Sequence, residues 1–456
     1  MSPSWKHRRV LIIGIARQGI ALARYLAAQG ADVTLNDRRS AEELAATRQA
    51  LADLPVSWAL GGHPLSLLDG TEIVCISGGV PLTLPIVEEA QRRGLPLSND
   101  TQIFLESVPC KVIGITGSAG KTTTTTLVGR MAQACHPHPV WVGGNIGQPL
   151  VEQLNEIQHR HLVVLELSSF QLELTTLSPQ VSAVLNITPN HLDRHGTMAA
   201  YTAAKARILD FQGAEDTAIL NHQDPGSAAL ASRVHGRLTW FGLERPPAGQ
   251  AGTFLNGNAL CYTDGHSEVQ LFDQECIQLR GTHNLLNVLA ACAIAISAGL
   301  PAEKLVSGVL GFGGVPHRLE LVRTWREVRW YNDSIATAPE RTIAAIHSFR
   351  EPLVLMLGGR DKNLPWESLA SLVCQRVGKV VVFGEATQKI LAALQAANCT
   401  ARIVCADGLQ AAVTAAAELA QPGDVVLFSP GGTSFDEFVD FEQRGERFRQ
   451  WVNELA

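Results

Sequence analysis

The chain has 456 residues, which is enough for about three domains of ordinary size. Hydrophobic residues make up 46% of it and charged residues 18%, which supplies a buried core and excludes extended disorder. The formal net charge is −6 and no block of Lys or Arg occurs, which argues against nucleic acid as the main partner.

The cysteines and the apolar segments both indicate a cytoplasmic protein. The nine cysteines form no CxxC pair, so we expect reduced, mostly buried thiols. Basic residues precede the first apolar run, as in a signal peptide, but the run breaks at Arg17-Gln18 and no cleavage site follows. The longest apolar stretch, Val288–Leu300, is too short and too rich in Ala to span a membrane, and it predicts a buried helix.

Residues 10–37 predict a βαβ unit. A strand at Val10–Ile13 leads into the turn GIARQG (14–19), a helix reaches Ala28, and a second strand from Asp32 ends at Asn36-Asp37. The G-x-A-x-x-G turn and the acid after the second strand resemble a dinucleotide fingerprint, although a turn without a ligand fits them too. A later strand, 72–76, ends in a small-residue loop that begins at Ser77, and such loops line the crevice of open α/β sheets.

The stretch Val112–Thr126 carries the clearest functional signal. An apolar, β-branched run ends in TGSAGKT (116–122), and helically spaced Leu, Val and Met residues follow. This order predicts a strand, a tight loop and a helix N-terminus, where backbone N–H groups favour an anion. Lys121 adds positive charge, and the Thr122 hydroxyl can ligate Mg²⁺. Ile115 stands where the full P-loop has its first glycine, so the loop is a shortened variant that predicts phosphate binding.

Two further predicted strands end in residues that suit a metal. One strand, 162–165, ends in Glu166, and another, 181–185, leads to a loop that contains His191. Because the carboxyl ends of parallel strands share one edge of a sheet, we expect both residues to lie beside Lys121 and Thr122. Divalent metal sites in phosphoryl transfer use such ligands. Each residue alone also fits a structural role, so the predicted metal site depends on their convergence.

The segment from 198 to 310 is less informative. Met198–Leu209 predicts a helix, on which composition alone makes Lys205 a solvated lysine. Residues 213–280 alternate short apolar runs with turn residues, which predicts a strand meander or a small α/β insert. Asn284 and Asn287 are three residues apart near a helix start, so they share a face and either read a purine edge or cap the helix.

A third unit follows the glycine-rich boundary at 311–316. Strands near 328–331, 353–357, 380–383 and 425–428 each end in polar or glycine-rich residues, which predicts an open, mostly parallel sheet. The sequence GGTSF (431–435) is not the Gly-x-Ser-x-Gly elbow of hydrolases, so we do not expect a serine nucleophile.

Taken together, the motifs resemble those of the Mur ligase family along the whole chain, from Gly14 to about Gln443. The motifs are GIARQG (14–19), GITGSAGKTT (114–123), GGNIG (143–147), LELSSFQLE (165–173), LNITPNHLDRH (185–195), YTAAKARI (201–208), GTHNLLN (281–287), PHRLE (316–320), NDSIAT (332–337), LGGRDK (357–362) and SPGGTSFDEFVDFEQRG (429–445). Within the family they resemble most closely the members that add D-glutamate to UDP-N-acetylmuramoyl-L-alanine in peptidoglycan precursor synthesis.

The resemblance implies an α/β protein of three domains. Residues 1–109 are expected to form a Rossmann-like domain for the uridine nucleotide, 110–314 a central P-loop-type ATPase domain, and 315–456 a Rossmann-like domain that binds the amino acid and closes on ATP. The implied protein is a cytoplasmic monomer acting on small molecules. In the family's reaction, ATP converts a carboxylate to an acyl phosphate and an amino acid then attacks it. Two Mg²⁺ ions and exclusion of water suit that chemistry.

The resemblance also assigns residues to ligands. Lys121, Glu166, His191 and Lys205 match catalytic positions, and the predicted metal set is Thr122, Glu166, His191 and a carbamylated Lys205. Matches to ATP-binding positions are Gly117, Ser118, Ala119, Gly120, Lys121, Thr122, Thr123, Asn145, Asn284, Asn287, Arg318 and Asp333. Matches on the uridine-nucleotide side are Gly14, Ala16, Arg17, Gln18, Asp37 and Ser77. Matches around the incoming glutamate are Thr337, Lys362, Ser434 and Phe441.

Three positions depart from the family pattern. Ala119 replaces the usual Asn of the phosphate loop, and Asn190 replaces the acid that commonly precedes the His. Ile335 replaces the usual Lys of NDSKAT, so a cation beside two carboxylate-bearing substrates is absent. The last change leaves L-glutamate as an alternative to D-glutamate.

Two other functions compete with this one. The first is an ATP-dependent amino acid ligase of the folylpolyglutamate type, which the GIARQG unit disfavours because that unit suits a nucleotide-linked substrate. The second is a nucleotide-dependent regulatory protein without ligase chemistry, supported only by Ala119 and Ile335.

Overall fold

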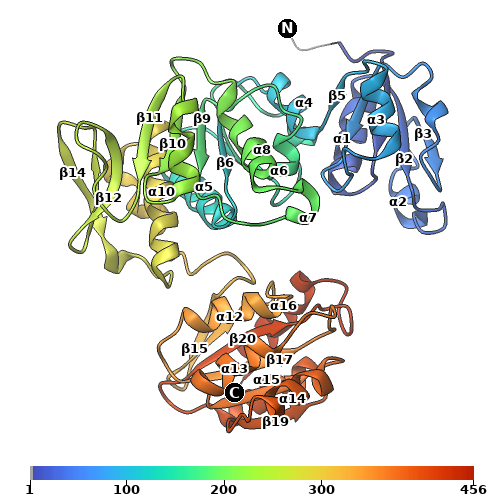
Figure 1. Cartoon of the computed structure of the whole chain (residues 1–456). Helices are drawn as coiled ribbons and strands as arrows, with labels where there is room; N and C mark the ends of the chain where they lie inside the picture. Colours follow the sequence, from blue (N-terminus) through green and yellow to red (C-terminus); the bar gives the residue numbers. More distant parts are fainter. Residues whose placement is uncertain (1–3, 456) are drawn as a thin grey trace. The chain divides into compact units, whose positions relative to one another are not determined.

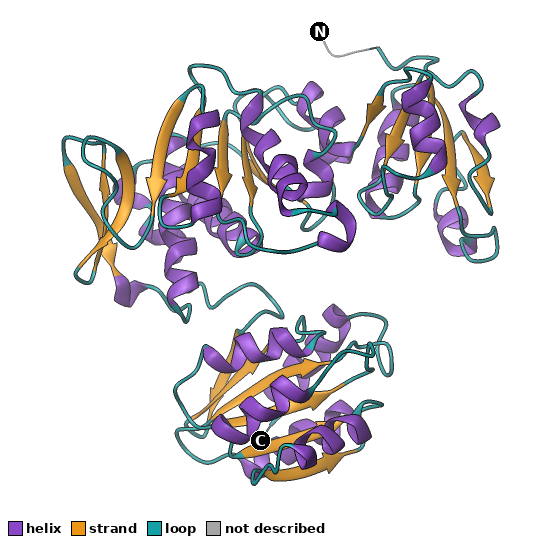
Figure 2. Ribbon diagram, viewed as in Figure 1, coloured by secondary structure: helices purple, strands orange, loops and turns teal. Residues whose placement is uncertain are grey.

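The computed structural model describes residues 4–455 and places them in two compact units (Figure 1). The first unit runs to Ile277 and includes His283–Leu310; the second contains Gln278–Thr282 and the chain from Gly311 onward. Strands and helices alternate along most of the chain, as Figure 2 shows, and the strands form three sheets. In the described residues, no helix is both long enough and apolar enough to cross a membrane.

The N-terminal sheet has five parallel strands in the order β3-β2-β1-β4-β5. Its strands are β1 (Arg9–Ile13), β2 (Asp32–Asp37), β3 (Val56–Leu60), β4 (Ile73–Ile76) and β5 (Leu97–Ser98), and the helices of this region are α1 (Arg17–Ala28), α2 (Ala45–Ala50), α3 (Pro85–Arg92) and α4 (Asp100–Ser107). The strand order reverses between β1 and β4, which is the point where doubly wound sheets bind ligands. The turn at Gly14 and the loop at Ser77 both leave the sheet there, as expected from the sequence.

The central sheet of the first unit has nine strands in the order β14-β13-β12-β11-β10-β9-β6-β8-β7. Its strands are β6 (Lys111–Thr116), β7 (Val140–Gly144), β8 (Leu162–Glu166), β9 (Val181–Val184), β10 (Thr217–Asn221), β11 (Arg237–Phe241), β12 (Ala251–Asn256), β13 (Ala259–Thr263) and β14 (Glu268–Asp273). Its helices are α5 (Lys121–Cys135), α6 (Ser169–Leu172), α7 (Leu192–His195), α8 (Met198–Asp210), α9 (Pro225–Ala228), α10 (Thr282–Ser297) and α11 (Val306–Val309). Strand β6 pairs in parallel with β8 and β9, so three functional loops leave one edge side by side.

Residues 213–280 confirm the expected strands. Strands β10, β11 and β12 continue the sheet in parallel, and β12, β13 and β14 then form an antiparallel extension. The buried helix expected at 288–300 is α10, whose residues Val288–Ala295 are all buried.

The sheet of the second unit has six strands in the order β15-β16-β20-β17-β18-β19. Its strands are β15 (Glu320–Trp325), β16 (Val328–Asn332), β17 (Leu353–Gly358), β18 (Lys379–Phe383), β19 (Arg402–Ala406) and β20 (Val425–Gly431), and the helices are α12 (Pro339–His347), α13 (Glu367–Arg376), α14 (Thr387–Ala396), α15 (Gly408–Leu419) and α16 (Phe441–Glu454). Only β15 is antiparallel, which confirms the mostly parallel sheet. One apolar cluster includes Leu355 and Leu427 and the other includes Met356 and Phe428, so neighbouring residues of a strand point to opposite faces.

Two expectations are wrong. Lys205 is only 1% exposed, because α8 turns this side chain toward the sheet and not toward solvent. The nine cysteines are free thiols, but only Cys75, Cys110, Cys261 and Cys292 are buried. Composition cannot reveal which face of a helix or strand is covered, and both errors come from that limit.

Candidate active site

The glycine loop between β6 and α5 has the predicted strand–turn–helix form. Gly117 has a φ of +157° and Gly120 a φ of +81°, which side chains disfavour. A Cβ on Gly120 would also lie 2.2 Å from Asn287 Oδ1, so α10 packs directly against the loop. Asn287 Nδ2 donates to Asn284 Oδ1 at 3.1 Å, which places both predicted asparagines beside this turn. The glycine turn therefore lets an anion come close to the backbone N–H groups in the first turn of α5.

Asn186, at the exit of β9, holds the glycine loop from the side. Its Oδ1 accepts from the Ala119 backbone N–H at 2.8 Å, and its Nδ2 donates to the Ala119 carbonyl at 3.1 Å. Ser118 Oγ contacts Tyr201 Oη at 3.0 Å and donates to the Thr188 carbonyl at 3.0 Å. The backbone of residue 119 is thus fixed without a side chain there. Sequence reasoning missed Asn186, although an amide directly after a buried strand was the available signal.

Two lysines converge on one carbonyl of the loop. Lys121 Nζ and Lys205 Nζ each donate to the Gly117 carbonyl at 2.9 Å, and Lys205 also donates to Thr116 Oγ1 at 3.3 Å. Burial, together with the charge of Lys121, lowers the pKa of Lys205 to about 6, while the charge of Glu166 opposes that shift. At neutral pH the Lys205 side chain is therefore mainly an uncharged amine.

Glu166 is 2% exposed at the end of β8. Its Oε1 accepts from Asn145 Nδ2 at 2.8 Å, whereas its buried Oε2 has no hydrogen-bond partner among residues 4–455. A buried carboxylate oxygen is costly without a partner, so this atom fits a bound cation. The described residues contain no cluster of three or more His, Cys, Asp or Glu side chains placed for a metal. The predicted metal ligands include only two side chains of these types, Glu166 and His191. The Thr122 hydroxyl, in the first turn of α5, is a third predicted ligand.

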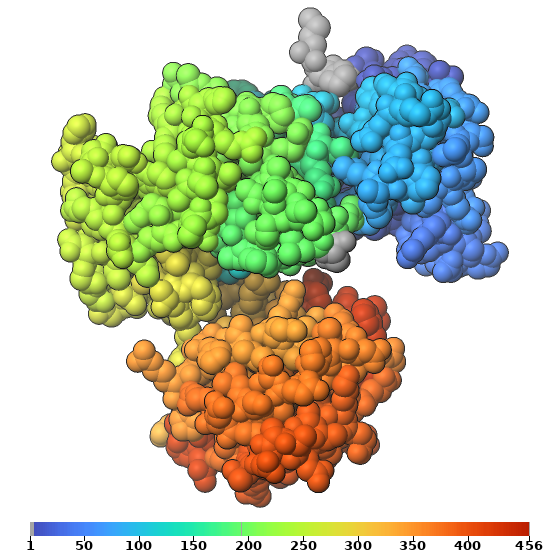
Figure 3. All heavy atoms as spheres, viewed as in Figure 1, coloured from blue at the N-terminus to red at the C-terminus, as the bar shows by residue number. Residues whose placement is uncertain are grey.

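The glycine turn at residues 14–19 contacts the loop that holds Glu166. Arg17 Nη2 donates at 3.1 Å to the carbonyl of Asn145, whose side chain bonds Glu166. Arg194 likewise donates at 3.3 Å to the Gly79 carbonyl in the loop after β4. Figure 3 shows the N-terminal residues of the first unit, in blue, in contact with its central residues, in green.

His191 lies on the loop after β9 and is exposed, with a φ of +53°. Its ring meets the edge of Phe170 with centroids 5.1 Å apart, and His195 stacks on Phe170 at 5.2 Å. Phe170 follows Glu166 by four residues, so aromatic contacts join the two loops that carry the predicted metal ligands. Sequence reasoning missed Phe170 and His195.

The predicted uridine-nucleotide residues are bonded to one another. Ser77 Oγ donates to the Gly14 carbonyl at 2.7 Å, and Gln18 Oε1 accepts from the Gly78 N–H at 3.2 Å. A Cβ on Gly19 would lie 2.1 Å from the Gly14 carbonyl oxygen, so only glycine fits. Ala16, the N-cap of α1, provides no side-chain cap for the first N–H groups of the helix.

Asp37 is already paired within the chain. It accepts the Ile15 N–H at 2.9 Å and makes a two-point ion pair with Arg39, at 3.0 and 2.7 Å. Burial alone would raise its pKa, but the hydrogen bonds from Arg39 and Ile15 hold the pKa of Asp37 far below its usual range. The sequence did not point to Arg39, whose guanidinium also donates to the Ile15 carbonyl at 2.8 Å.

In the second unit, Asp333 is a buried carboxyl at the end of β16. It accepts from Ser429 Oγ at 2.7 Å and from the Leu319 N–H at 3.2 Å. Burial raises the pKa of Asp333 to about 7, although the hydrogen bond from Ser429 and the charge of Arg318 oppose the rise. Two predicted ATP residues, Arg318 and Asp333, are therefore electrostatic neighbours.

The four predicted glutamate-binding residues belong to the second unit. Thr337, Lys362 and Ser434 lie on the loops after β16, β17 and β20, and Phe441 begins α16. Lys362 Nζ donates to Thr337 Oγ1 at 3.4 Å. The fully buried Arg444, which sequence reasoning missed, donates to the Ser334 and Gly432 carbonyls at 2.8 and 3.1 Å. It thereby joins the loop before Thr337 to the loop that carries the buried Ser434, and Ser334 Oγ donates to the Phe441 carbonyl at 2.8 Å.

A cation does lie near Ile335. The Arg341 guanidinium donates to the Ile335 carbonyl at 3.1 Å, and its charge opposes the rise that burial causes in the pKa of Asp333.

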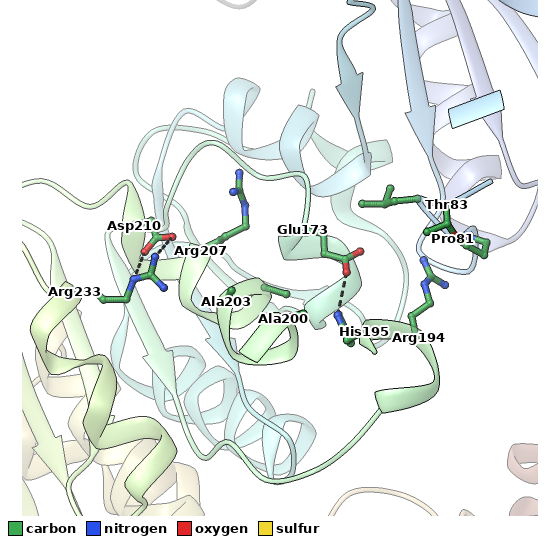
Figure 4. Close-up of a pocket in the computed structure, with 12 residues that line it drawn as sticks. Pro81, Thr83, Glu173, Arg194, His195, Ala200, Ala203, Arg207, Asp210 and Arg233 are labelled. Carbon is green, nitrogen blue, oxygen red and sulfur yellow. Dashed lines mark hydrogen bonds and ion pairs between the residues drawn. The ribbon is translucent and has the colours of Figure 1, made fainter. Parts of the chain in front are cut away.

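A cavity of about 620 Å³ opens in the first unit beside α8 (Figure 4). It contains none of the predicted site residues. Its lining residues are Pro81, Leu82, Thr83, Glu173, Arg194, His195, Ala200, Ala203, Ala204, Arg207, Asp210 and Arg233.

Three family descriptions match successive parts of the chain. Residues 8–98 match the Mur ligase MurD-like N-terminal domain, 115–295 the Mur ligase middle domain, and 317–432 the Mur ligase glutamate ligase domain. They cover the N-terminal sheet, most of the central sheet and the sheet of the second unit, respectively.

Full-length relatives and solved structures agree with these matches. The chain is 40% identical over 448 residues to the UDP-N-acetylmuramoylalanine–D-glutamate ligase of Symbiobacterium thermophilum, and 38% identical over 450 residues to that of Koribacter versatilis; each match covers 98% of both chains. The fold is similar to that of UDP-N-acetylmuramate-alanine ligase MurC from Thermotoga maritima, with a TM-score of 0.58, 18% identity and coverage of 98% of this chain and 100% of that one. It is also similar to MurF ligase from Thermotoga maritima in complex with ADP, with a TM-score of 0.54, 18% identity and coverage of 100% and 98%.

Proposed function

This chain belongs to the Mur ligase family, and we propose on that basis that it joins D-glutamate to UDP-N-acetylmuramoyl-L-alanine in peptidoglycan precursor synthesis. It is an ATP-dependent, ADP-forming amide ligase that acts on small molecules. The observation that carries the proposal is the convergence of Lys121 and Lys205 on the Gly117 carbonyl, within electrostatic reach of the buried carboxylate of Glu166.

We assign the three substrates to three parts of the chain. Residues 1–109 bind the uridine nucleotide, 110–314 bind ATP, and 315–456 bind the amino acid and close on ATP. The hydrogen bond from Arg17 to Asn145 supports this assignment, because Asn145 also bonds Glu166. A donor held at the turn 14–19 would therefore lie near the proposed metal and phosphate site. We further propose that the enzyme is a cytoplasmic monomer.

The reaction needs the acyl carboxylate to become an electrophile. Transfer of the terminal phosphoryl group of ATP to that carboxylate gives an acyl phosphate and ADP. The amine of D-glutamate then attacks the acyl carbon, forms the amide and releases inorganic phosphate. Lys121 stabilises negative charge that develops on the phosphoryl oxygens during transfer.

The glycine loop is the centre of the proposed ATP site. The residues that hold the nucleotide in the first unit are Gly117, Ser118, Ala119, Gly120, Lys121, Thr122, Thr123, Asn145, Asn284 and Asn287, and those in the second unit are Arg318 and Asp333. Support comes from the glycine geometry, the pairing of the two asparagines beside Gly120, and the charge of Arg318 at Asp333.

Thr122, Glu166 and His191 would hold Mg²⁺, and the unpartnered Oε2 of Glu166 fits that role. When bound, the cation neutralises phosphate charge during transfer. Lys205 contributes through its uncharged amine, which forms an N–C bond with carbon dioxide and loses a proton to give a carbamate anion. The lowered pKa of Lys205 makes this reaction available at neutral pH.

The acyl donor and the amino acid have separate groups of residues. Gly14, Ala16, Arg17, Gln18 and Ser77 line the uridine-nucleotide side, and Asp37 shapes it through Arg39 and Ile15. Around the glutamate we place Thr337, Lys362, Ser434 and Phe441. Lys362 suits the side-chain carboxylate of the substrate, because a charged donor strengthens a hydrogen bond to an anion.

Phosphate release from ATP tests the proposal. With UDP-N-acetylmuramoyl-L-alanine and Mg²⁺ present, we expect release to require D-glutamate and to be far slower with L-glutamate. Equal rates with both isomers would refute the assignment of D-glutamate. Slow release that ignores both co-substrates would refute ligase function and favour a nucleotide-dependent binding protein.

A further inference from the structure

A chain of three side chains connects the two loops that carry Glu166 and His191. Glu173 Oε1 lies 3.1 Å from His195 Nδ1, and His195 Nε2 lies 2.9 Å from Ser169 Oγ. The His195 side chain is 2% exposed and Ser169 is 3% exposed, so water scarcely competes for the bond between them, whereas Glu173 is 20% exposed. Ser169 begins α6 three residues after Glu166, and His195 ends α7.

Aromatic stacking supports the same connection. Phe170 lies against His195 on one face, with centroids 5.2 Å apart and planes 8° apart, and meets His191 at 5.1 Å. The Arg194 guanidinium is 4.6 Å from the centre of the Phe170 ring. The His195 N–H also donates to the His191 carbonyl at 3.0 Å, which makes the two histidines the ends of one helical turn.

The arrangement resembles a Glu-His-Ser triad, but its serine cannot meet a substrate. Glu173 and His195 line the 620 Å³ cavity, as Figure 4 shows, whereas Ser169 does not line it and is buried. A nucleophile must reach its substrate, so Ser169 does not act as one. The hydrogen bonds among Glu173, His195 and Ser169 instead orient these side chains.

We propose that His195 is a positioning residue of the ligase reaction, which sets the spacing between Glu166 and His191 through Ser169, Phe170 and Glu173. The inference rests on the proposed function, in which those two side chains hold the cation. Glu173 fixes the imidazole, the imidazole fixes Ser169 at the start of α6, and the stack on Phe170 aligns the loop of His191. A displacement of about 1 Å in such a site can cost up to about 10²-fold in rate.

The test compares His195→Phe with Arg233→Gln. His195→Phe keeps a ring against Phe170 but removes both hydrogen bonds. Arg233 pairs with Asp210 in the same cavity and serves as the matched control. Binding of Mn²⁺ is measured by electron paramagnetic resonance in the presence of a non-hydrolysable ATP analogue. The melting temperature, kcat, and KM for UDP-N-acetylmuramoyl-L-alanine are measured on the same preparations.

We expect His195→Phe to weaken Mn²⁺ binding and to lower kcat by about 10-fold each, with KM for the sugar nucleotide unchanged. Adding Ser169→Ala to His195→Phe should cause no further loss, because both changes break one connection. Arg233→Gln should match the wild type. If His195→Phe does not fold, Ser169→Ala alone carries the test and should weaken Mn²⁺ binding in the same direction.

Wild-type Mn²⁺ affinity in His195→Phe, or in Ser169→Ala if His195→Phe does not fold, would overturn the inference. So would losses of activity that only follow the fraction of folded protein. A wild-type enzyme without phosphate release dependent on D-glutamate would instead refute the proposed function, so the two failures are distinguishable.

Discussion

The first unit contains two turns of the same strand–turn–helix plan that distribute charge in opposite ways. At the turn 14–19, the nearby carboxylate of Asp37 is neutralised by Arg39 within the chain. At the turn 117–122, Lys121 and Lys205 both donate to the Gly117 carbonyl. The first turn is electrostatically satisfied by its own residues, whereas the second concentrates two basic nitrogens on one backbone oxygen.

This difference indicates which turn binds polyphosphate. A glycine pattern only permits close approach of a backbone to a ligand, and both turns have that property, at Gly19 and at Gly120. At the second turn, the charge of Lys121 and the backbone N–H groups at the start of α5 favour a highly charged anion. If each turn binds its own ligand, a substitution at one turn should leave binding at the other unchanged.

The largest expected effect follows from Lys121→Ala. Loss of this cation should lower kcat for ligation by about 10³-fold, because charge on the transferred phosphoryl group would lose a fixed partner. Affinity for the uridine nucleotide, measured by calorimetry, should stay within about twofold, a change too small to reflect a lost contact. Lys111→Ala, at the opposite end of β6, is the control. Loss of uridine-nucleotide binding in Lys121→Ala would show that the turns are not independent.

Lys205→Ala should lower kcat by about 10²-fold, with partial rescue by formate or acetate. A small carboxylate can occupy the place of the carbamate, whereas chloride at equal ionic strength cannot. Steady-state rates with and without each salt are the measurement. Absence of rescue would remove carbamylation from the account and leave Lys205 as an uncharged hydrogen-bond donor to Gly117.

The pH dependence of stability tests the state of Lys205 directly. In the unfolded chain this lysine keeps its proton until pH ~10.4, while in the folded chain its pKa is about 6. Between these values the unfolded state binds more protons, so the contribution of Lys205 to stability rises with pH by up to about 1.4 kcal/mol per unit. We expect Lys205→Met to lose that rise between pH 7 and pH 9 in urea unfolding, in buffer free of carbon dioxide. Parallel curves for both proteins would show that Lys205 is protonated when folded.

The smallest expected effect concerns the first turn. Asp37→Asn breaks the two-point pairing with Arg39, so KM for the sugar nucleotide should rise about 10-fold, as for loss of one charged hydrogen bond. The value of kcat and the affinity for ADP should not change. Asp53→Asn, at an exposed acid of the same region, is the control. A large fall in kcat for Asp37→Asn would show that Asp37 takes part in the reaction itself. It would contradict the view that the turn at 14–19 only binds substrate.

The features that could be predicted from the sequence are those set by residues close together along the chain. The inner strands of the three sheets, the glycine loop and the residues Glu166 and His191 after their strands could be read from apolar runs and turn residues. The edge strands β3, β5, β7, β15 and β19 were not predicted. The burial of Lys205 could not be predicted either, because α8 is rich in Ala and shows no strong polar face. The pairs Asp37–Arg39 and His195–Ser169 were also missed, since the first depends on how the residues after a strand fold back and the second on contact between two loops.

Positional isotope exchange in ATP tests most directly whether the charged turn transfers phosphate to an acyl donor held at the other turn. ATP labelled with ¹⁸O in the β,γ bridge is incubated with the enzyme, Mg²⁺ and UDP-N-acetylmuramoyl-L-alanine, without glutamate. We expect movement of the label into non-bridging positions of the β-phosphate that requires the sugar nucleotide and is absent in Lys121→Ala. Exchange without the sugar nucleotide, or no exchange while wild-type ligation proceeds, would contradict it.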